Sequence, residues 1–281
     1  MKSLKRLKTP LRYPGGKSRA TKFLFEHLPE NITSYREPFV GGGSVAIEFA
    51  KRFPDVPVWV NDVYYNLFCF WTQLQKNNTA LFNSIMDRKL KAESFEDSTQ
   101  AHRELFLECR DRLNNGGIDP FQRAICFFIA NKCSFSGLGE SSGFSASASK
   151  SNFSVNNITN LVDYLPLIKN WTITNLDYTE LLSDCKEGDF VFADPPYDIK
   201  SFLYGKKGKH HHGFGHYDFF AEMSKCDGNV MITYNSNAVL RDLYHGWNQT
   251  EWDLTYTMHS GKAYREDEGN RKELLVTNYA T

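Results

Sequence analysis

The sequence has little that would place it in a membrane or direct it out of the cell. No apolar run approaches the roughly 18 residues that a membrane-spanning helix needs. The basic N-terminal segment also lacks an apolar core of signal-peptide length. We therefore expect a cytoplasmic protein with no membrane contact. Its 281 residues suffice for one large domain, or for a core domain that carries an insert.

Cysteine is scarce, and its spacing excludes the usual metal sites. None of the six cysteines forms a Cys-x-x-Cys pair, so zinc or iron–sulfur ligation is not expected. We expect no metal, and we expect the thiols to be buried and reduced. The cysteines are Cys69, Cys109, Cys126, Cys133, Cys185 and Cys226.

Net charge is absent as well, since 33 Lys and Arg residues balance 33 Asp and Glu residues. A nucleic-acid binder is often basic overall, but here the distribution matters more than the sum. Residues 1–22 are basic and contain no acidic residue, and residues 200–212 form a second cluster of lysines and histidines. Two such segments favour contact with phosphate groups.

The order of apolar runs and turns predicts an α/β fold. Residues 35–62 have the pattern of a strand, a glycine turn, a helix over 45–53 and a second strand. This is one βαβ-type unit, as found in parallel sheets. Further strands are expected at 171–175, 189–193, 229–234 and 273–278, with a helix near 217–225.

Residues 67–165 have a different composition and predict an insert. They are rich in helical patterns and then enter a serine- and glycine-rich stretch at 134–150. Such a stretch cannot bury a core by itself, and it is typical of a disordered linker or of a loop that orders on a partner. We therefore expect one sheet domain, formed by 1–66 and 166–281, that is interrupted by 67–165.

The most informative motif is Asp194-Pro195-Pro196-Tyr197, which follows the apolar run 190–193. Proline has no backbone N–H for a sheet, so the motif ends a buried strand. Ligands bind at this edge of an open α/β sheet. Asp194 and the Pro195 carbonyl are suited to accept hydrogen bonds from a planar exocyclic amine, and Tyr197 is suited to stack on its ring. Taken alone, the motif is also compatible with a simple strand-ending turn.

Two glycine turns accompany this motif. The first, at 41–43, allows a ligand to approach the backbone, and Asp62 lies at the end of the next strand, where an acidic residue binds ribose hydroxyls. Pro38 and Phe39 supply an apolar wall beside it. The second turn, Tyr13-Pro14-Gly15-Gly16-Lys17, lacks Walker spacing but can hold a small carboxylate; a surface lysine on a turn is the alternative.

Taken together, these motifs resemble those of the Dam-like N6-adenine DNA methyltransferases. The order in that family matches Pro14-Gly15-Gly16-Lys17, Glu37-Pro38-Phe39-Val40-Gly41-Gly42-Gly43-Ser44, Asn61-Asp62, Asp194-Pro195-Pro196-Tyr197 and the ending 273–279. The resemblance implies a Rossmann-like methyltransferase sheet, S-adenosylmethionine as the methyl donor, and a target-recognition domain in the 67–165 insert. It also implies that adenine in duplex DNA is flipped from the helix and methylated by direct in-line transfer.

The resemblance assigns roles to individual residues. Lys17 is expected near the methionine carboxylate of the donor, and Asp62 at its ribose hydroxyls. Asp194 to Tyr197 are expected to hold the target adenine. The remaining donor contacts are expected from Tyr13, Gly16, Phe39, Gly41, Gly42, Gly43, Ser44, Asp177, Tyr178 and Asp194.

The target sequence is a separate question. Relatives that read GATC carry an arginine where this chain has Glu140, and glutamate cannot donate to guanine but can accept from cytosine N4–H. A site other than GATC is therefore expected. Phe135 is a candidate stacking wedge, and Lys206 and Lys207 lie in a 200–216 loop that is a candidate lid. The candidates for DNA contact are Lys132, Phe135, Ser136, Glu140, Lys206 and Lys207.

Three other functions compete with this hypothesis. An RNA or protein-glutamine methyltransferase more often has Asn at the position of Asp194 and lacks the insert. A dinucleotide oxidoreductase needs Gly-x-Gly-x-x-Gly, which is absent after Gly41. A non-catalytic DNA-binding module would not need a donor pocket. We expect a monomeric, bacterial or phage-encoded, nucleoid-associated enzyme that acts on double-stranded DNA, with a cognate restriction endonuclease as its partner in a restriction-modification system.

Overall fold

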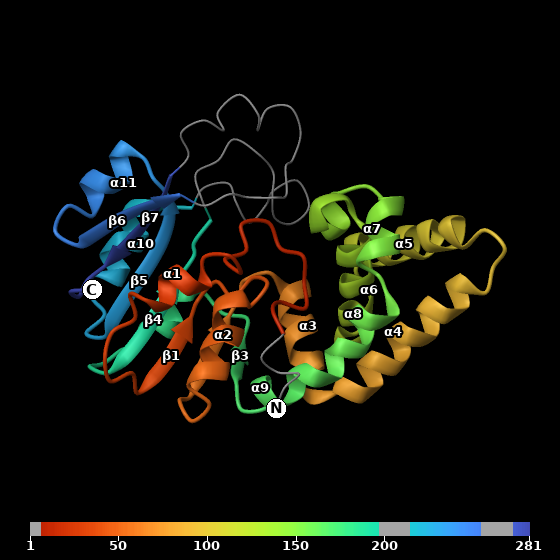
Figure 1. The fold of residues 1–281 in the computed structure, drawn as a ribbon, viewed down its shortest axis with the longest axis horizontal. Helices are drawn as coiled ribbons and strands as arrows, with labels where there is room; N and C mark the ends of the chain where they lie inside the picture. Colours follow the sequence, from red (N-terminus) through yellow and green to blue (C-terminus); the bar gives the residue numbers. More distant parts are fainter. Residues whose placement is uncertain (1–6, 197–213, 254–271) are drawn as a thin grey trace.

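The computed structural model describes residues 7–196, 214–253 and 272–281, and its described part is organised around one seven-stranded sheet. The strand order is β3-β2-β1-β4-β5-β7-β6, which Figure 1 shows with β6 and β7 at one end and β3 at the other. The strands are β1 (Ser34–Glu37), β2 (Val58–Asn61), β3 (Thr172–Thr174), β4 (Asp189–Ala193), β5 (Asn229–Asn235), β6 (Asn248–Asp253) and β7 (Lys272–Thr277).

The first five strands are parallel, and the order of the sheet reverses at β1. Strand β1 pairs in parallel with β2 on one side and with β4 on the other. The carboxyl ends of β1 and β4 therefore lie side by side at a topological switch point, where open α/β sheets bind ligands. Strand β7 runs antiparallel between β5 and β6, so its first residues lie at this same edge.

Helices cover the sheet through apolar faces. Helix α2 (Ser44–Arg52) buries one side, and its Phe49 ring stacks on Tyr35 of β1 with ring centroids 4.3 Å apart. All five residues of β4 are buried, as expected for a central parallel strand covered on both faces. The other helices of the sheet unit are α1 (Thr21–Phe25), α10 (His216–Met223) and α11 (Ala238–Leu243).

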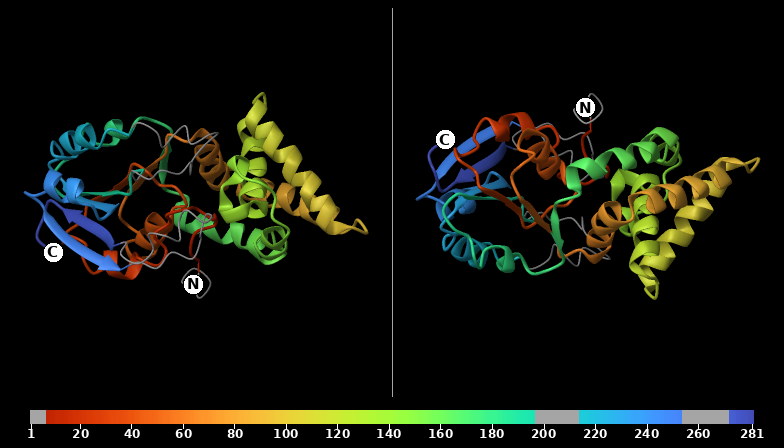
Figure 2. Two further views of the ribbon diagram at one scale, coloured as in Figure 1. Left: turned by 90° about the horizontal axis from the view of Figure 1, so that it is seen from above. Right: turned by 90° about the horizontal axis from the view of Figure 1, so that it is seen from below.

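A group of helices lies between β2 and β3 in the sequence and beyond β3 in space (Figures 1 and 2). The first of these helices, α3 (Tyr65–Lys76), packs against both the sheet unit and the other helices. Its Trp71 donates the indole N–H to the Gly41 carbonyl at 3.1 Å, and its Phe70 stacks on Phe128 of the helical group. One continuous apolar core results. The helices are α3 (Tyr65–Lys76), α4 (Asn78–Glu93), α5 (Ser98–Asn115), α6 (Pro120–Cys133), α7 (Ala146–Ser151), α8 (Val155–Thr159) and α9 (Leu165–Ile168).

The α/β fold class predicted from the sequence is confirmed as a Rossmann-like, mostly parallel sheet. One strand was not predicted. Strand β6 is polar and half exposed at the sheet edge, so it has no apolar run to mark it. The stretch 134–150 is folded, which corrects the expectation of a linker. It forms two short 3-10 turns and α7, and Ser134 and Ser149 are buried there.

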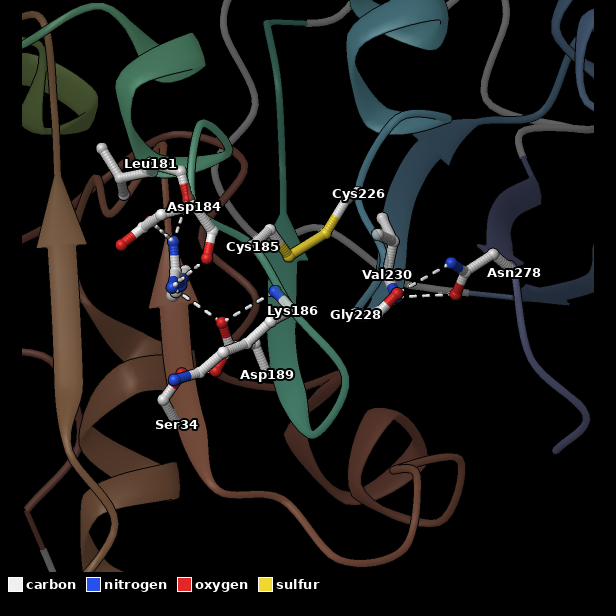
Figure 3. Close-up of a disulfide and its surroundings, with 11 residues drawn as sticks. Ser34, Leu181, Asp184, Cys185, Lys186, Asp189, Cys226, Gly228, Val230 and Asn278 are labelled. Atoms are coloured by element: carbon white, nitrogen blue, oxygen red, sulfur yellow. Dashed lines mark hydrogen bonds and ion pairs between the residues drawn. A yellow bond between two sulfur atoms is a disulfide. The ribbon is translucent and has the colours of Figure 1, made fainter.

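The expectation that all the thiols are reduced is wrong for one pair. Cys185 and Cys226 form a disulfide, because the segments that lead into the neighbouring strands β4 and β5 bring their Cα atoms to 5.4 Å. Figure 3 shows the bond beside β4, between the segments that precede β4 and β5. The other four cysteines are free and buried.

Among the described residues, no helix combines the length and apolar character needed to cross a membrane.

Candidate active site

Three acidic side chains gather where parallel strands end. Asp194 follows β4 directly, Glu37 is the last residue of β1, and Asp62 follows β2. These strands are neighbours in the sheet, so the three residues share the switch-point edge. Pro195 and Pro196 then turn the chain away from β4, and Pro195 is buried.

Asp194 is held by two donors from different elements. The Lys17 ammonium lies 2.8 and 2.9 Å from its two carboxylate oxygens, and the Thr233 hydroxyl of β5 donates to Oδ1 at 2.8 Å. About a fifth of the Asp194 side chain remains exposed. Lys17 and Thr233 therefore fix the orientation of this carboxylate, as a site that binds a substrate amine requires.

Lys17 is a buried cation whose charge is balanced by acidic partners. Only 1% of its side chain is exposed, and it also donates to the Gly15 carbonyl at 3.0 Å. A second carboxylate, Glu273 at the start of β7, lies 3.9 Å from its ammonium group. Burial of a charge is tolerated when it is paired in this way. The Lys17 ammonium, which the family resemblance places near the methionine carboxylate of the donor, thus contacts Asp194.

The glycine turn at 41–43 has no room for side chains. Gly41 and Gly43 have positive φ angles of 48° and 70°, which favour glycine. A Cβ at Gly41 would lie 2.8 Å from the Tyr13 ring, and one at Gly43 would lie 2.5 Å from Trp71. Tyr13 therefore packs directly on the turn, and Ser44 begins α2 immediately after it.

Asp62 accepts hydrogen bonds from two backbone amides. The N–H groups of Gly41 and Tyr64 donate to its two oxygens at 3.0 and 2.9 Å. A carboxylate has about four lone-pair sites, so capacity remains for two hydroxyl groups. Burial raises the pKa of Asp62 to about 7, although the Gly41 amide opposes the shift. The side chain is half-buried, so a ligand can reach it.

An aromatic cluster lies beside the glycine turn. Phe39 has Tyr178, Phe214 and Phe219 as ring neighbours, at centroid distances of 5.6 to 5.8 Å. Asp177, which precedes Tyr178, is exposed and accepts hydrogen bonds from the backbone and hydroxyl of Thr179. The cluster provides an apolar wall of the kind a nucleobase needs, with a carboxylate at its margin.

The structure adds three residues that sequence reasoning did not place in the site: Glu37, Thr233 and Glu273. Burial raises the pKa of Glu37 well above its ordinary range, and the Tyr35 hydroxyl donates to this carboxyl group at 2.6 Å. Glu37 precedes the glycine turn and was detectable there. Glu273 opens the ending 273–279 that matches the family, but that motif gave it no role in the site, and Thr233 had no local signal. The placement of both depends on how β5 and β7 pair.

The candidates for DNA contact at the end of α6 and on the turn 134–140 have different surroundings. Phe135 is 53% exposed, and Ser136 has a positive φ of 53°, which is uncommon for a residue other than glycine. Lys132 is buried against the Phe128 ring, and this burial lowers its pKa to about 8. The Glu140 carboxylate is turned inward, where Tyr64 and Asn66 donate to it.

Three other predicted residues, Tyr197, Lys206 and Lys207, lie outside the described residues, as does the 200–216 loop before residue 214. Of the predicted donor residues, the structure brings Tyr13 to the glycine turn at 41–43, and the Gly16 N–H donates to the Tyr13 carbonyl at 3.1 Å.

Comparisons with known proteins agree on one family. The model of the D12 class N6 adenine-specific DNA methyltransferase family matches residues 13–258. Type II methyltransferase M.CviBI of Paramecium bursaria Chlorella virus NC1A is 24% identical over 284 residues, covering 97% of this chain and all of that protein. Type II methyltransferase M1.LlaDCHI of Lactococcus lactis subsp. cremoris is 25% identical, covering 95% and 94%. The DNA N-6-adenine-methyltransferase of Escherichia phage P1 is 25% identical, covering 83% of this chain and 30% of that protein.

Proposed function

Since the chain belongs to the D12 class N6 adenine-specific DNA methyltransferases, we propose that Asp194 and the Pro195 carbonyl hold the reacting amine at the switch-point edge. The enzyme uses S-adenosylmethionine to methylate adenine N6 in DNA. The observation that carries the proposal is the orientation of Asp194 by Lys17 and Thr233.

The chemistry explains why an oriented carboxylate is needed. The lone pair of adenine N6 is delocalised into the ring, so the nitrogen is a poor nucleophile. Hydrogen bonds from N6–H to Asp194 and the Pro195 carbonyl favour a more tetrahedral nitrogen, whose lone pair can attack in line. The Asp194 charge would stabilise the positive charge that develops on the nitrogen as the bond between the methyl carbon and the donor sulfur breaks, and the nitrogen would then lose one N6 proton to solvent. Fixed positioning supplies much of the remaining rate enhancement.

The residues around the glycine turn fit the methyl donor. The two remaining lone-pair sites of Asp62 match the two hydroxyls of a ribose. Phe39 and Tyr178 form an apolar wall for the donor adenine, and the glycine turn allows close backbone approach. When bound, the donor supplies a methyl group on an electrophilic sulfonium. The chain's own residues hold and orient the donor and the amine.

Further proposals concern the DNA. We propose that residues 67–165 form the target-recognition domain, that the adenine is flipped out of duplex DNA, and that Tyr197 stacks on it. Phe135 is the exposed apolar side chain of the 134–140 turn and is our candidate wedge. The names of the relatives support a role in a restriction-modification system, in which a cognate endonuclease cuts the unmethylated site.

Single-molecule sequencing tests the function directly. DNA from a methylation-free host that expresses the chain should carry N6-methyladenine at one motif, and that motif is the site a cognate endonuclease would cut. The Asp194→Ala variant should abolish the mark while still binding the donor product S-adenosylhomocysteine. Asp55→Ala is the matched control, because Asp55 is exposed in the turn before β2, at the opposite edge. Unchanged methylation by Asp194→Ala would refute the role of Asp194.

A further inference from the structure

The turn 134–140 between α6 and α7 is held at two points by segments that lead into the donor site. One segment contains Arg12 and continues to Tyr13 and Lys17. The other contains Tyr64 and Asn66 and directly follows Asp62. We call these contacts the Arg12 tie and the Glu140 tie. Together they connect the part of the helical group proposed to meet DNA with the residues proposed to hold the donor.

The Arg12 tie is a reciprocal pair of hydrogen bonds at the end of α6. Asn131 is 1% exposed, accepts from the Arg12 amide at 3.0 Å and donates to the Arg12 carbonyl at 2.7 Å. The same Asn131 amide donates to the Gly137 carbonyl at 2.9 Å. The Arg12 guanidinium donates to the Ser134 carbonyl at 2.9 Å. One side chain thus joins the Arg12 backbone to the turn.

Gly137 makes this contact tight. Its φ is +74°, and a Cβ there would lie 2.5 Å from the Arg12 carbonyl oxygen. The two backbones are therefore in direct contact, and the hydrogen bonds of Asn131 to both keep them from separating. Five residues farther along that segment, Lys17 contacts Asp194. A short stretch of chain therefore separates the turn from the proposed catalytic carboxylate.

The Glu140 tie reaches the other side of the donor site. Glu140 accepts from the Tyr64 hydroxyl and, at 3.0 Å, from the Asn66 amide. The Tyr64 backbone N–H donates to Asp62 at 2.9 Å, so a single residue contacts both carboxylates. Arg123 of α6 donates to Asn66 at 2.7 Å and secures the tie from the helical side.

We propose that Asn131 and Glu140 are positioning residues that make donor binding and DNA binding mutually dependent. The inference rests on the proposed function of the Asp62 and Asp194 site. When the turn engages DNA, the two ties transmit its position to the Tyr13–Lys17 segment and to Asp62. By thermodynamic reciprocity, bound donor then strengthens DNA binding by the same factor. Glu140 acts by holding the turn, and it does not read a base.

The test measures the affinity of the chain for S-adenosylhomocysteine with and without a DNA duplex. The duplex carries the motif that the sequencing experiment identifies. For the unmodified chain, the duplex should increase the affinity at least about fivefold. Tyr64→Phe removes one donor to Glu140 and keeps the ring, and should lower this factor, while the Asn66 bond and the Arg12 tie remain. Affinity for each ligand alone should change less than about twofold. Tyr65→Phe, at the exposed neighbouring tyrosine, is the matched control and should behave like the unmodified chain.

Two more variants separate positioning from packing and from base reading. Glu140→Gln keeps an acceptor oxygen and should retain most of the coupling, whereas Glu140→Ala should lose it. Adding Tyr64→Phe to Glu140→Ala should cause no further loss, because both remove one contact. Asn131→Asp keeps the acceptor for Arg12 but loses both donor bonds, so its coupling should fall as well.

The outcomes are distinct from those that test the function. If the unmodified chain methylates DNA but shows no coupling, the inference is refuted and the function stands. Coupling that survives in both Tyr64→Phe and Glu140→Ala would also overturn it. A changed methylation motif in Glu140→Gln would show that Glu140 reads a base, which contradicts the positioning role. Absence of methylation by the unmodified chain would instead refute the proposed function.

Discussion

Asp62 illustrates at the scale of one residue how burial and hydrogen bonding set the charge of a binding group. Burial raises its pKa to about 7, and the Gly41 amide only partly offsets this shift. In the protein without bound donor, a carboxyl group with a raised pKa adds to the free energy of unfolding when the pH lies below the ordinary carboxyl pKa. This contribution is lost as the pH rises through about 7. Ribose hydroxyls donate to the ionised form, so donor binding has the opposite pH dependence.

We expect the affinity for S-adenosylhomocysteine to rise with pH up to about 7 and then level off. Below the pKa of Asp62, each decrease of one pH unit should reduce the affinity by up to about tenfold, because only the ionised carboxylate accepts from both hydroxyls. Calorimetric titration at a series of pH values measures this affinity. Asp62→Asn should bind more weakly but with a flat profile, and a steep profile in that variant would assign the titration to another group.

Thr233 allows a second test at the residue scale. Its hydroxyl orients Asp194 at 2.8 Å, and a hydrogen bond to a charged group contributes about 1.5–3 kcal/mol. Thr233→Val keeps the shape and should slow methyl transfer by about 10- to 100-fold, with the S-adenosylhomocysteine affinity unchanged. Thr233→Ser should restore most of the rate. Single-turnover kinetics decides, and a variant affected only in donor affinity would contradict an orienting role.

At the scale of elements, the glycine turn shows how a strand, a turn and two helices depend on one residue. Gly43 precedes α2 in a left-handed conformation, with φ +70°. Its missing side chain leaves the space that Trp71 of α3 fills, and Trp71 in turn donates to the Gly41 carbonyl. The turn that is proposed to wrap the donor is therefore built partly by the helical group.

Two glycines with nearly the same φ angle separate these effects. Gly117 has φ +72° but nothing within 4 Å of an added Cβ, whereas at Gly43 the Cβ would lie 2.5 Å from Trp71. Gly117→Ala should cost about 1 kcal/mol, the penalty of a side chain at positive φ. Gly43→Ala should cost about 1–3 kcal/mol more, because of overpacking. Urea denaturation measures both, and equal losses would show that Trp71 moves aside freely.

At the scale of the whole molecule, one face of the sheet shares an apolar core with the helical group, and the other face forms a second core with α10 and α11. Buried residues from Tyr35 and Phe49 to Phe70 and Phe128 belong to the same cluster. The change in composition near residue 67 therefore marks a change of secondary structure, without a break in the packing. The boundaries of 67–165 as a recognition domain stay a prediction, because α3 contributes to both parts.

The disulfide is a second feature of the whole molecule, since it links segments 41 residues apart. Closing a loop of that length stabilises a protein by about 4 kcal/mol in the chain-entropy model. We expect reductant to lower the free energy of unfolding by about that amount and to have no effect on a Cys185→Ser/Cys226→Ser variant. Thiol titration of the unfolded chain should find four groups before reduction and six after it. Six groups before reduction would show that the bond is absent.

The motifs alone were sufficient to predict the fold class, the family and the donor, because each is a short contiguous pattern whose chemistry is local. An apolar run ended by Asp194-Pro195-Pro196 and a glycine turn followed by Asp62 carry their meaning within a few residues. The predicted strand at 229–234 is local in the same sense, and it matches β5.

Folding was required for everything that depends on pairing between distant segments. Lys17 meets Asp194 and Glu273 only because β4, β5 and β7 are neighbours in the sheet. Glu140 contacts Tyr64 and Asn66 because α3 and α6 pack together. The pairing of Cys185 with Cys226 has the same origin in the adjacency of β4 and β5. Such contacts join residues far apart in the chain, and a single sequence has no local pattern that records them.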